Sequence, residues 1–93
     1  MAHEVRDNTE RSRFELVDDD RVLGYADYHQ QGDVLVFPHT VIDPSLRGQG
    51  LGAELVGGAL DQVRASGRRV QAQCWYVAQF IDEHAEYREL LAA

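Results

Sequence analysis

The chain has 93 residues, of which 44% are hydrophobic and 27% charged, and its formal net charge at pH 7 is −7. This length predicts one domain with a modest core, and the acidic balance argues against nucleic-acid binding, which depends on cationic contacts to phosphate. No apolar run is long enough to span a membrane, and a single cysteine without an export signal predicts a cytoplasmic protein without an internal disulfide.

The N-terminal part of the chain is first polar and then strand-like. Residues 1–11 show no hydrophobic periodicity, so we predict a flexible arm followed by a single domain over residues 12–93. The acidic triplet over residues 18–20 is interpreted as a solvated hairpin tip, because no calcium-loop spacing follows it. Alternating and β-branched residues predict three strands. The first begins with residues 14–17, the second runs over residues 22–29, and the third runs over residues 34–42.

A glycine-rich segment and an amphipathic helix follow the third strand. Pro38 lies inside that strand and predicts a bulge or a break, because proline cannot donate a ladder hydrogen bond. The helix is expected from about Leu51 to Ser66, with Gly67 as its left-handed C-terminal residue. Its predicted buried face comprises Leu51, Leu55, Val56, Ala59, Leu60 and Val63.

The C-terminal part predicts one more strand and one more helix. A short strand is expected over residues 69–74, and the last helix buries a face that includes Val77, Phe80, Ile81 and His84. Strand, helix and strand form a βαβ unit, so its two strands are expected to run parallel with a right-handed crossover. The earlier strands are joined by short turns and must be antiparallel. The predicted fold is α+β with a mixed sheet.

The segment Leu46–Gly52 has the composition of an anion site, because glycines let a phosphate approach the free N–H groups of a helix N-terminus. The chain contains no lysine, which excludes a P-loop. A relaxed dinucleotide fingerprint is present, but residues 70–75 lack the acidic residue that would hold a ribose. A phosphorylated ligand other than a nicotinamide or flavin dinucleotide is therefore expected.

The pattern Arg47-x-x-Gly50-x-Gly52 resembles the pyrophosphate-binding signature R/Q-x-x-G-x-G/A of the GNAT acetyltransferase superfamily. The longer runs over residues 39–52 and 74–87 resemble the small, single-domain N-acetyltransferases of the YjdJ type. The resemblance implies a GNAT-like sheet whose two parallel strands splay apart to hold acetyl-CoA (coenzyme A). Two departures are Ala85, where many relatives have proline, and the glycine pair Gly57-Gly58 inside the helix.

The resemblance also implies which residues hold the cofactor. The backbone of Thr40, Val41 and Ile42 would meet the pantetheine arm as an added strand would. The loop and the first turn of the helix would hold the pyrophosphate through backbone N–H groups and the helix dipole. These residues are Arg47, Gly48, Gln49, Gly50, Leu51, Gly52 and Ala53.

Cys74 is the predicted catalytic nucleophile, since it lies between a strand end and a helix start, and a cysteine at this position is regarded as catalytic in the resembled group. The alternative is a buried thiol that only packs. His39 is the candidate base, toward Cys74 or toward the acceptor, and a structural histidine is its alternative. Tyr76 and Tyr87 are candidate proton donors to the departing thiolate, with core packing as the alternative. No metal site is expected.

The leading functional hypothesis is an acetyl-CoA-dependent N-acyltransferase acting on an amine, which is a small molecule, a peptide or a protein. The net charge of −7 favours a cationic acceptor, although solubility alone also explains it. The alternative is a coenzyme A-binding interaction module with little or no catalysis, and a third hypothesis is a structural subunit whose loop binds nothing. A monomer or a simple homo-oligomer is expected, with neither nucleic acid nor membrane as a partner.

Overall fold

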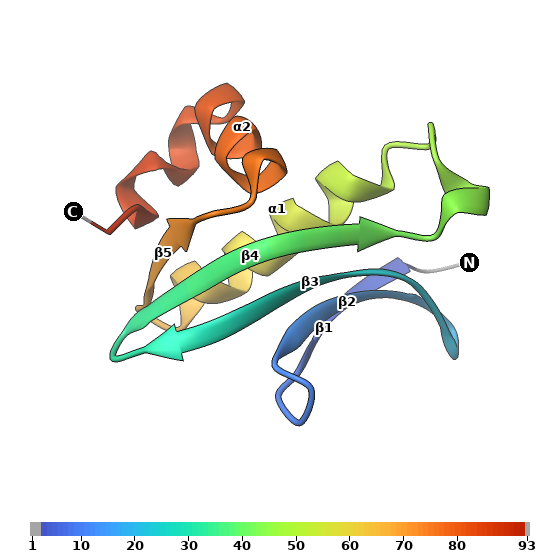
Figure 1. Cartoon of the computed structure of the whole chain (residues 1–93), viewed down its shortest axis with the longest axis horizontal. Coiled ribbons are helices and arrows are strands. Elements are labelled where there is room, and N and C mark those ends of the chain that lie inside the picture. Colours follow the sequence, from blue (N-terminus) through green and yellow to red (C-terminus); the bar gives the residue numbers. More distant parts are fainter. Residues whose placement is uncertain (1–2, 93) are drawn as a thin grey trace.

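The five strands form one sheet in the order in which they occur along the chain. The computed structural model describes residues 3–92. Neighbouring strands are antiparallel except the last pair, β4 and β5, which is parallel (Figure 1). This confirms the predicted mixed α+β fold. The strands are β1 (His3–Asn8), β2 (Arg13–Asp18), β3 (Arg21–Gln31), β4 (Val34–Ile42) and β5 (Arg69–Ala72), and the helical elements are η1 (Pro44–Leu46), α1 (Leu51–Ala65), α2 (Trp75–Glu83) and η2 (Ala85–Leu90).

The first strand was not expected. The prediction of a flexible arm over residues 1–11 was wrong for His3–Asn8, which pairs with β2 from His3 opposite Asp18 to Asn8 opposite Arg13. Backbone hydrogen bonding makes this strand, and its one apolar side chain, Val5, packs against the core. Residues 1 and 2 lie outside the described part of the chain.

A bulge interrupts β4 at the predicted proline. His39 pairs with Asp27 of β3 and Val36 pairs with His29, so that Phe37 and Pro38 together oppose the single residue Tyr28. Two residues against one is the geometry of a β-bulge, which bends a strand and re-aims its side chains. The predicted interruption at Pro38 is thus confirmed as a bulge.

The helix α1 packs across the sheet and contacts all five strands. Its buried residues are the six that the sequence predicts, and Gly67 follows it with a φ of +75°. The glycine pair inside α1 has a packing role, because a Cβ on Gly58 would lie 2.8 Å from the Cβ of Val5. Gly58 therefore lets β1 approach the helix closely, which offsets the poor helix propensity of glycine.

The pairing of β4 with β5 covers only half of β4. Val34–Phe37 pair with Arg69–Ala72, and the N–H groups of Gln73 and Cys74 then both donate to the carbonyl of Phe37. After Cys74 the chain turns away from β4 into α2, which packs beside β4 and β5 (Figure 1). An opening is left beside Pro38–Ile42. No helix within residues 3–92 is long and apolar enough to cross a membrane.

Candidate functional site

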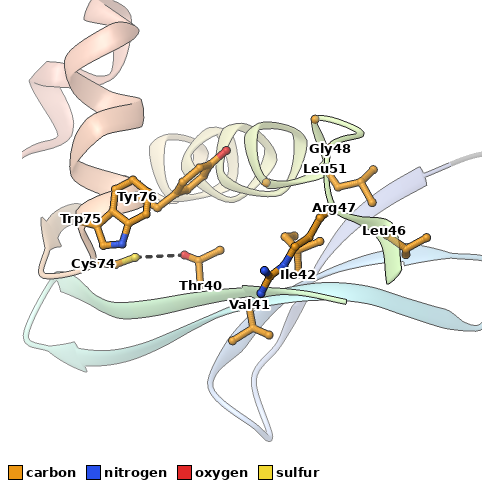
Figure 2. A pocket seen from close by; sticks show the side chains of 12 residues that line it. Thr40, Val41, Ile42, Leu46, Arg47, Gly48, Leu51, Cys74, Trp75 and Tyr76 are labelled. Carbon is orange, nitrogen blue, oxygen red and sulfur yellow. Dashed lines mark hydrogen bonds between the residues drawn. The ribbon is translucent and has the colours of Figure 1, made fainter. Parts of the chain in front are cut away.

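A pocket of about 580 Å³ occupies the opening between β4, the start of α1 and the start of α2. This volume lies within the range usual for small-molecule sites. Figure 2 shows Cys74 and Trp75 at one end of the pocket and Arg47 and Gly48 at the other. Eight of the ten predicted cofactor residues line it, namely Thr40, Val41, Ile42, Arg47, Gly48, Gly50, Leu51 and Gly52.

The start of α1 supplies free hydrogen-bond donors to this pocket. The N-cap residue is Gly50, at a φ of +75°, and no side chain caps the helix. Gly48 is also left-handed, at +84°, so the loop follows a path that suits glycine alone. The first N–H groups of the helix therefore point into the loop without a side-chain acceptor, which makes this end of the pocket attractive to an anion.

A short turn before the loop fixes its position. The carboxylate of Asp43 accepts hydrogen bonds from the Ser45 N–H at 3.0 Å and the Ser45 hydroxyl at 2.9 Å, and Arg21 lies 3.2 Å from its other oxygen. The Ser45 backbone and hydroxyl hydrogen bonds, together with Arg21, hold the pKa of Asp43 below its usual range. This caps η1 and ties the turn to the start of β3.

Arg47 is the one charged residue among the described residues that line the pocket. Its side chain is exposed and makes no ion pair within residues 3–92. Figure 2 shows it extending back across the mouth of the pocket toward Val41. The anion-attracting end of the pocket is thus reinforced by an available guanidinium group.

The second half of β4 forms the floor of the pocket. Thr40, Val41 and Ile42 pair with Ala26, Tyr25 and Gly24 of β3, whereas no residue of β5 reaches them. Their other backbone edge is therefore open to an extended ligand, which can bind as an added strand does.

Cys74 lies at the inner end of the pocket as the N-cap residue of α2. It is 8% exposed, and its thiol is 3.7 Å from the hydroxyl of Thr40 (Figure 2). The pairing of these two side chains bridges β4 to α2 where the strands separate. Cys74 is thus both packed and accessible from the pocket.

Tyr76 closes the pocket on the side of α1. A Cβ on Gly52 would lie 2.7 Å from the Tyr76 hydroxyl, so the glycine is what allows the phenol to lie over the first turn of the helix. Burial raises the pKa of Tyr76, with a smaller contribution from Glu83, so the phenol is held in its protonated form. Among the predicted proton donors, Tyr76 is the one that lines the pocket.

The structure does not bring His39 to Cys74. The His39 side chain is 57% exposed, with its Nε2 2.5 Å from the Asp27 carboxylate, and it does not line the pocket. Because successive residues of a strand point to opposite faces, His39 faces away when Thr40 faces Cys74. The hypothesis that His39 is the base for Cys74 is corrected accordingly. A role toward an acceptor from the opposite face of β4 stays a prediction.

Three further residues of the hypothesis lie outside the pocket, and one residue that lines it was not predicted. Tyr87 donates to Asp61 at 2.8 Å outside the pocket, and burial together with this bond raises its pKa to about 12. Gln49 does not line the pocket, and Ala53 lines a smaller neighbouring hollow. Trp75 lines both hollows. An apolar residue at the start of a helix gave no signal for that role.

Metal chemistry has no candidate site in the described chain. Within residues 3–92, no three His, Cys, Asp or Glu side chains lie together as a metal site would require. The polar side-chain groups of the pocket are instead a thiol, a hydroxyl, a phenol, an indole N–H and a guanidinium.

Comparisons with known proteins agree with this geometry. The sequence profile of the family described as "GCN5-related N-acetyl-transferase" matches residues 13–90. The solution structure of a GCN5-like protein from Staphylococcus aureus superposes with a TM-score of 0.72 at 20% sequence identity, covering 97% of this chain and 88% of that one. At this identity the structural match shows a shared fold. Among curated proteins, none matches the sequence.

The profile match spans most of the chain, including the loop, β4 and Cys74. The chain therefore belongs to the GCN5-related N-acetyltransferase family, and family membership indicates acyl transfer.

Proposed function

We propose that this member of the GCN5-related N-acetyltransferase family binds acetyl-CoA in the pocket beside β4 and transfers the acetyl group to an amine. The observation that carries the proposal is the meeting of three features in one pocket. These are the uncapped start of α1 behind Arg47, the open edge of β4, and the thiol of Cys74.

The residues present fit acetyl-CoA along the length of the pocket. At the outer end, the N–H groups after Gly50 and the guanidinium of Arg47 would hold the pyrophosphate. Along the floor, the open backbone of Thr40–Ile42 would bind the amide groups of the pantetheine arm. The ligand supplies, when bound, an acyl group activated as a thioester.

At the inner end the chain offers a small set of groups for acyl transfer. The Thr40 hydroxyl orients the Cys74 thiol, and the protonated Tyr76 phenol is available to give a proton to a departing thiolate. Cys74 would act either as a nucleophile that carries the acetyl group or as part of the wall for direct attack by the amine.

A second candidate function is coenzyme A binding with little or no turnover. One observation favours it: the described residues that line the pocket include no carboxylate and no histidine that could accept the amine's proton. A cationic amine would then depend on its own small unprotonated fraction or on a base outside the pocket.

The subfamily, the cellular location and the acceptor of the protein are proposals as well. We propose that the chain is of the small YjdJ type, that it acts in the cytoplasm, and that its acceptor is a cationic small molecule, peptide or protein. The resemblance of residues 39–52 and 74–87 supports the first, and the net charge of −7 supports the last.

The experiment that tests the proposal combines a thiol-release assay over a panel of amines with mass measurement of the protein. If Cys74 carries the acetyl group, acetyl-CoA adds one acetyl mass that hydroxylamine removes, and Cys74→Ala abolishes both the adduct and turnover. Turnover that survives Cys74→Ala without an adduct indicates direct attack. Coenzyme A binding without thiol release for any amine supports the second candidate and contradicts the proposed catalysis.

A further inference from the structure

A second hollow lies beside the main pocket, between the first turn of α1 and one face of α2. Its volume is about 250 Å³. Trp75 and Tyr76 line both hollows, so the second one adjoins the main pocket at the start of α2, directly after Cys74. We call it the α2 groove. It is lined chiefly by Ala53, Trp75, Tyr76, Gln79, Glu83 and His84.

Trp75 is exposed in a way that packing does not explain. It is 73% exposed, the largest exposed fraction among the large hydrophobic residues of the described chain, and it touches the Tyr76 ring edge-on at 5.7 Å between centroids. A tryptophan on a cavity rim offers a flat face for an aliphatic chain or a cation. Its position on the rim of both hollows suits contact with a ligand.

The other end of the α2 groove is acidic. Glu83 is the one carboxylate in its lining, and its only described hydrogen bond is a 3.3 Å contact from the Gln79 amide within the same helix. The groove lining contains no Arg. His84 also lines the groove; it stacks on Phe80 at 4.0 Å and uses its Nδ1 to donate to the Phe80 carbonyl at 2.8 Å. Glu83 is thus free to receive a cation from the ligand.

The length of the groove sets the spacing of the ligand's charges. Trp75 and Glu83 are eight residues apart on one helix, which corresponds to about 12 Å along its axis. An amine that reacts beside Cys74 and lies along the groove would place a second cation near Glu83 if its two charges were on the order of 10 Å apart.

We propose that the α2 groove is the acceptor subsite for a linear di- or polyamine, with its chain on Trp75 and its distal ammonium on Glu83. This inference rests on the proposed acyl transfer to an amine and names the acceptor's chemical class. It assigns Trp75 and Glu83 to acceptor binding, not to the transfer step.

The chain reports on the groove directly, because Trp75 is its only tryptophan. The experiment titrates the protein, without coenzyme A, with 1,8-diaminooctane or with octylamine, which has the same carbon chain and one amino group. Trp75 fluorescence is followed at low ionic strength and pH 8, where both amines are protonated. We expect the diamine to bind about fivefold more tightly than the monoamine, the upper range for one exposed ion pair.

Matched carboxylate variants separate the groove from the general charge of the protein. Glu83→Gln is expected to abolish the preference for the diamine. Asp82→Asn removes the neighbouring charge on α2, outside the groove, and is expected to leave the preference unchanged. Equal affinity of the two amines, or equal loss in the two variants, overturns the proposal. Competition by 3′-phospho-ADP for the diamine overturns it too, since the groove would then belong to the cofactor.

This test is independent of turnover. A protein that binds the diamine through Glu83 but releases no thiol contradicts the proposed catalysis and leaves the subsite intact. A protein that acetylates amines but binds the diamine no more tightly than the monoamine supports the proposed catalysis and overturns the subsite.

Discussion

The two halves of β4 differ in what lies beside them. Val34–Val36 pair with β3 on one side, and Val34–Phe37 pair with β5 on the other. Leu35, Val36 and Phe37 are at most 1% exposed. His39–Ile42 pair only with β3, and three of these residues, Thr40, Val41 and Ile42, line the pocket. The boundary is the bulge at Phe37–Pro38. One strand therefore contributes to the core with its first half and to the candidate site with its second.

This comparison predicts that the two halves respond differently to loss of a side chain. Phe37 packs against the rings of Phe14 and Tyr28, with centroids 6.1 and 6.2 Å away. Phe37→Ala is expected to lower the free energy of unfolding by about 3–5 kcal/mol, because it leaves a cavity in the core. Val41→Ala, at an exposed position of the open half, is expected to cost at most about 1 kcal/mol.

Urea denaturation of both variants checks this prediction. Comparable losses of stability in the two variants would show that the open half also supports the fold, and the proposed division of β4 would fail.

Glycine-to-alanine changes within α1 sharpen the comparison, because the same substitution faces the core at one position and the pocket at another. At Gly58 the new methyl would collide with Val5 of β1, so Gly58→Ala is expected to destabilise the protein by about 1–3 kcal/mol. Gly57→Ala is the control, since its Cβ would only touch Phe80 at 3.4 Å. At position 57 the gain in helix propensity from alanine offsets the steric cost of the contact with Phe80.

Gly52→Ala is expected to act on the ligand and hardly on stability. Its methyl would displace the Tyr76 ring from the first turn of α1 and narrow the pocket beside the start of that helix. We expect about a tenfold loss of coenzyme A affinity by calorimetry, which corresponds to about 1.4 kcal/mol. Unchanged affinity would mean that Tyr76 moves aside without consequence and does not help to shape the pocket.

The sequence predicted the parts of the fold whose signals are local. The apolar face of α1 follows from helical periodicity over fifteen residues, and the loop follows from glycines between a strand and a helix. Strand β1 was missed because only Val5 in it is apolar and packs on the core, so no pattern distinguishes it from a polar arm.

The site was harder to predict because it depends on contacts between distant segments. A bulge re-aims the side chains that follow it, so Pro38 predicted the bulge but not the face on which His39 would lie. The approach of Tyr76 to Gly52 joins α2 to α1, and nothing in the local sequence encodes it. The proposed roles of Trp75 and Glu83 could be inferred only from the hollow between the two helices, which the sequence does not reveal.

The smallest expected effect concerns a region outside β4, where β1 meets the first turn of α1. His3 Nδ1 lies 3.0 Å from the Glu54 carboxylate, and its Nε2 is 3.9 Å from Asp18. The hydrogen bond to Glu54, with both carboxylates nearby, raises the pKa of His3 above its usual 6.5. The stabilisation is complete below pH 6.5 and is lost as pH rises through the raised pKa.

Measuring the free energy of unfolding against pH in wild type and His3→Gln checks this prediction. The wild type is expected to lose stability above pH 6.5 relative to the variant, whereas His29→Gln, at an exposed histidine without an ion pair in the described chain, should follow the wild type. Parallel curves for wild type and His3→Gln would contradict the assignment.

The most direct test of the central claim, that the glycine loop and the open half of β4 bind coenzyme A, is thermal unfolding with and without coenzyme A. At a hundred times the Kd, the ligand adds about 2.7 kcal/mol, which raises Tm by roughly 10–20 °C in a domain of this size. Gly50→Asp puts a carboxylate at the uncapped start of α1, where it takes the free N–H groups and repels pyrophosphate. Gly32→Asp is the matched control, because Gly32 is also left-handed and open, at a turn outside the pocket. The account predicts a full shift in wild type and Gly32→Asp and none in Gly50→Asp. No shift in the folded wild type at millimolar coenzyme A, or an equal shift in Gly50→Asp, would contradict it.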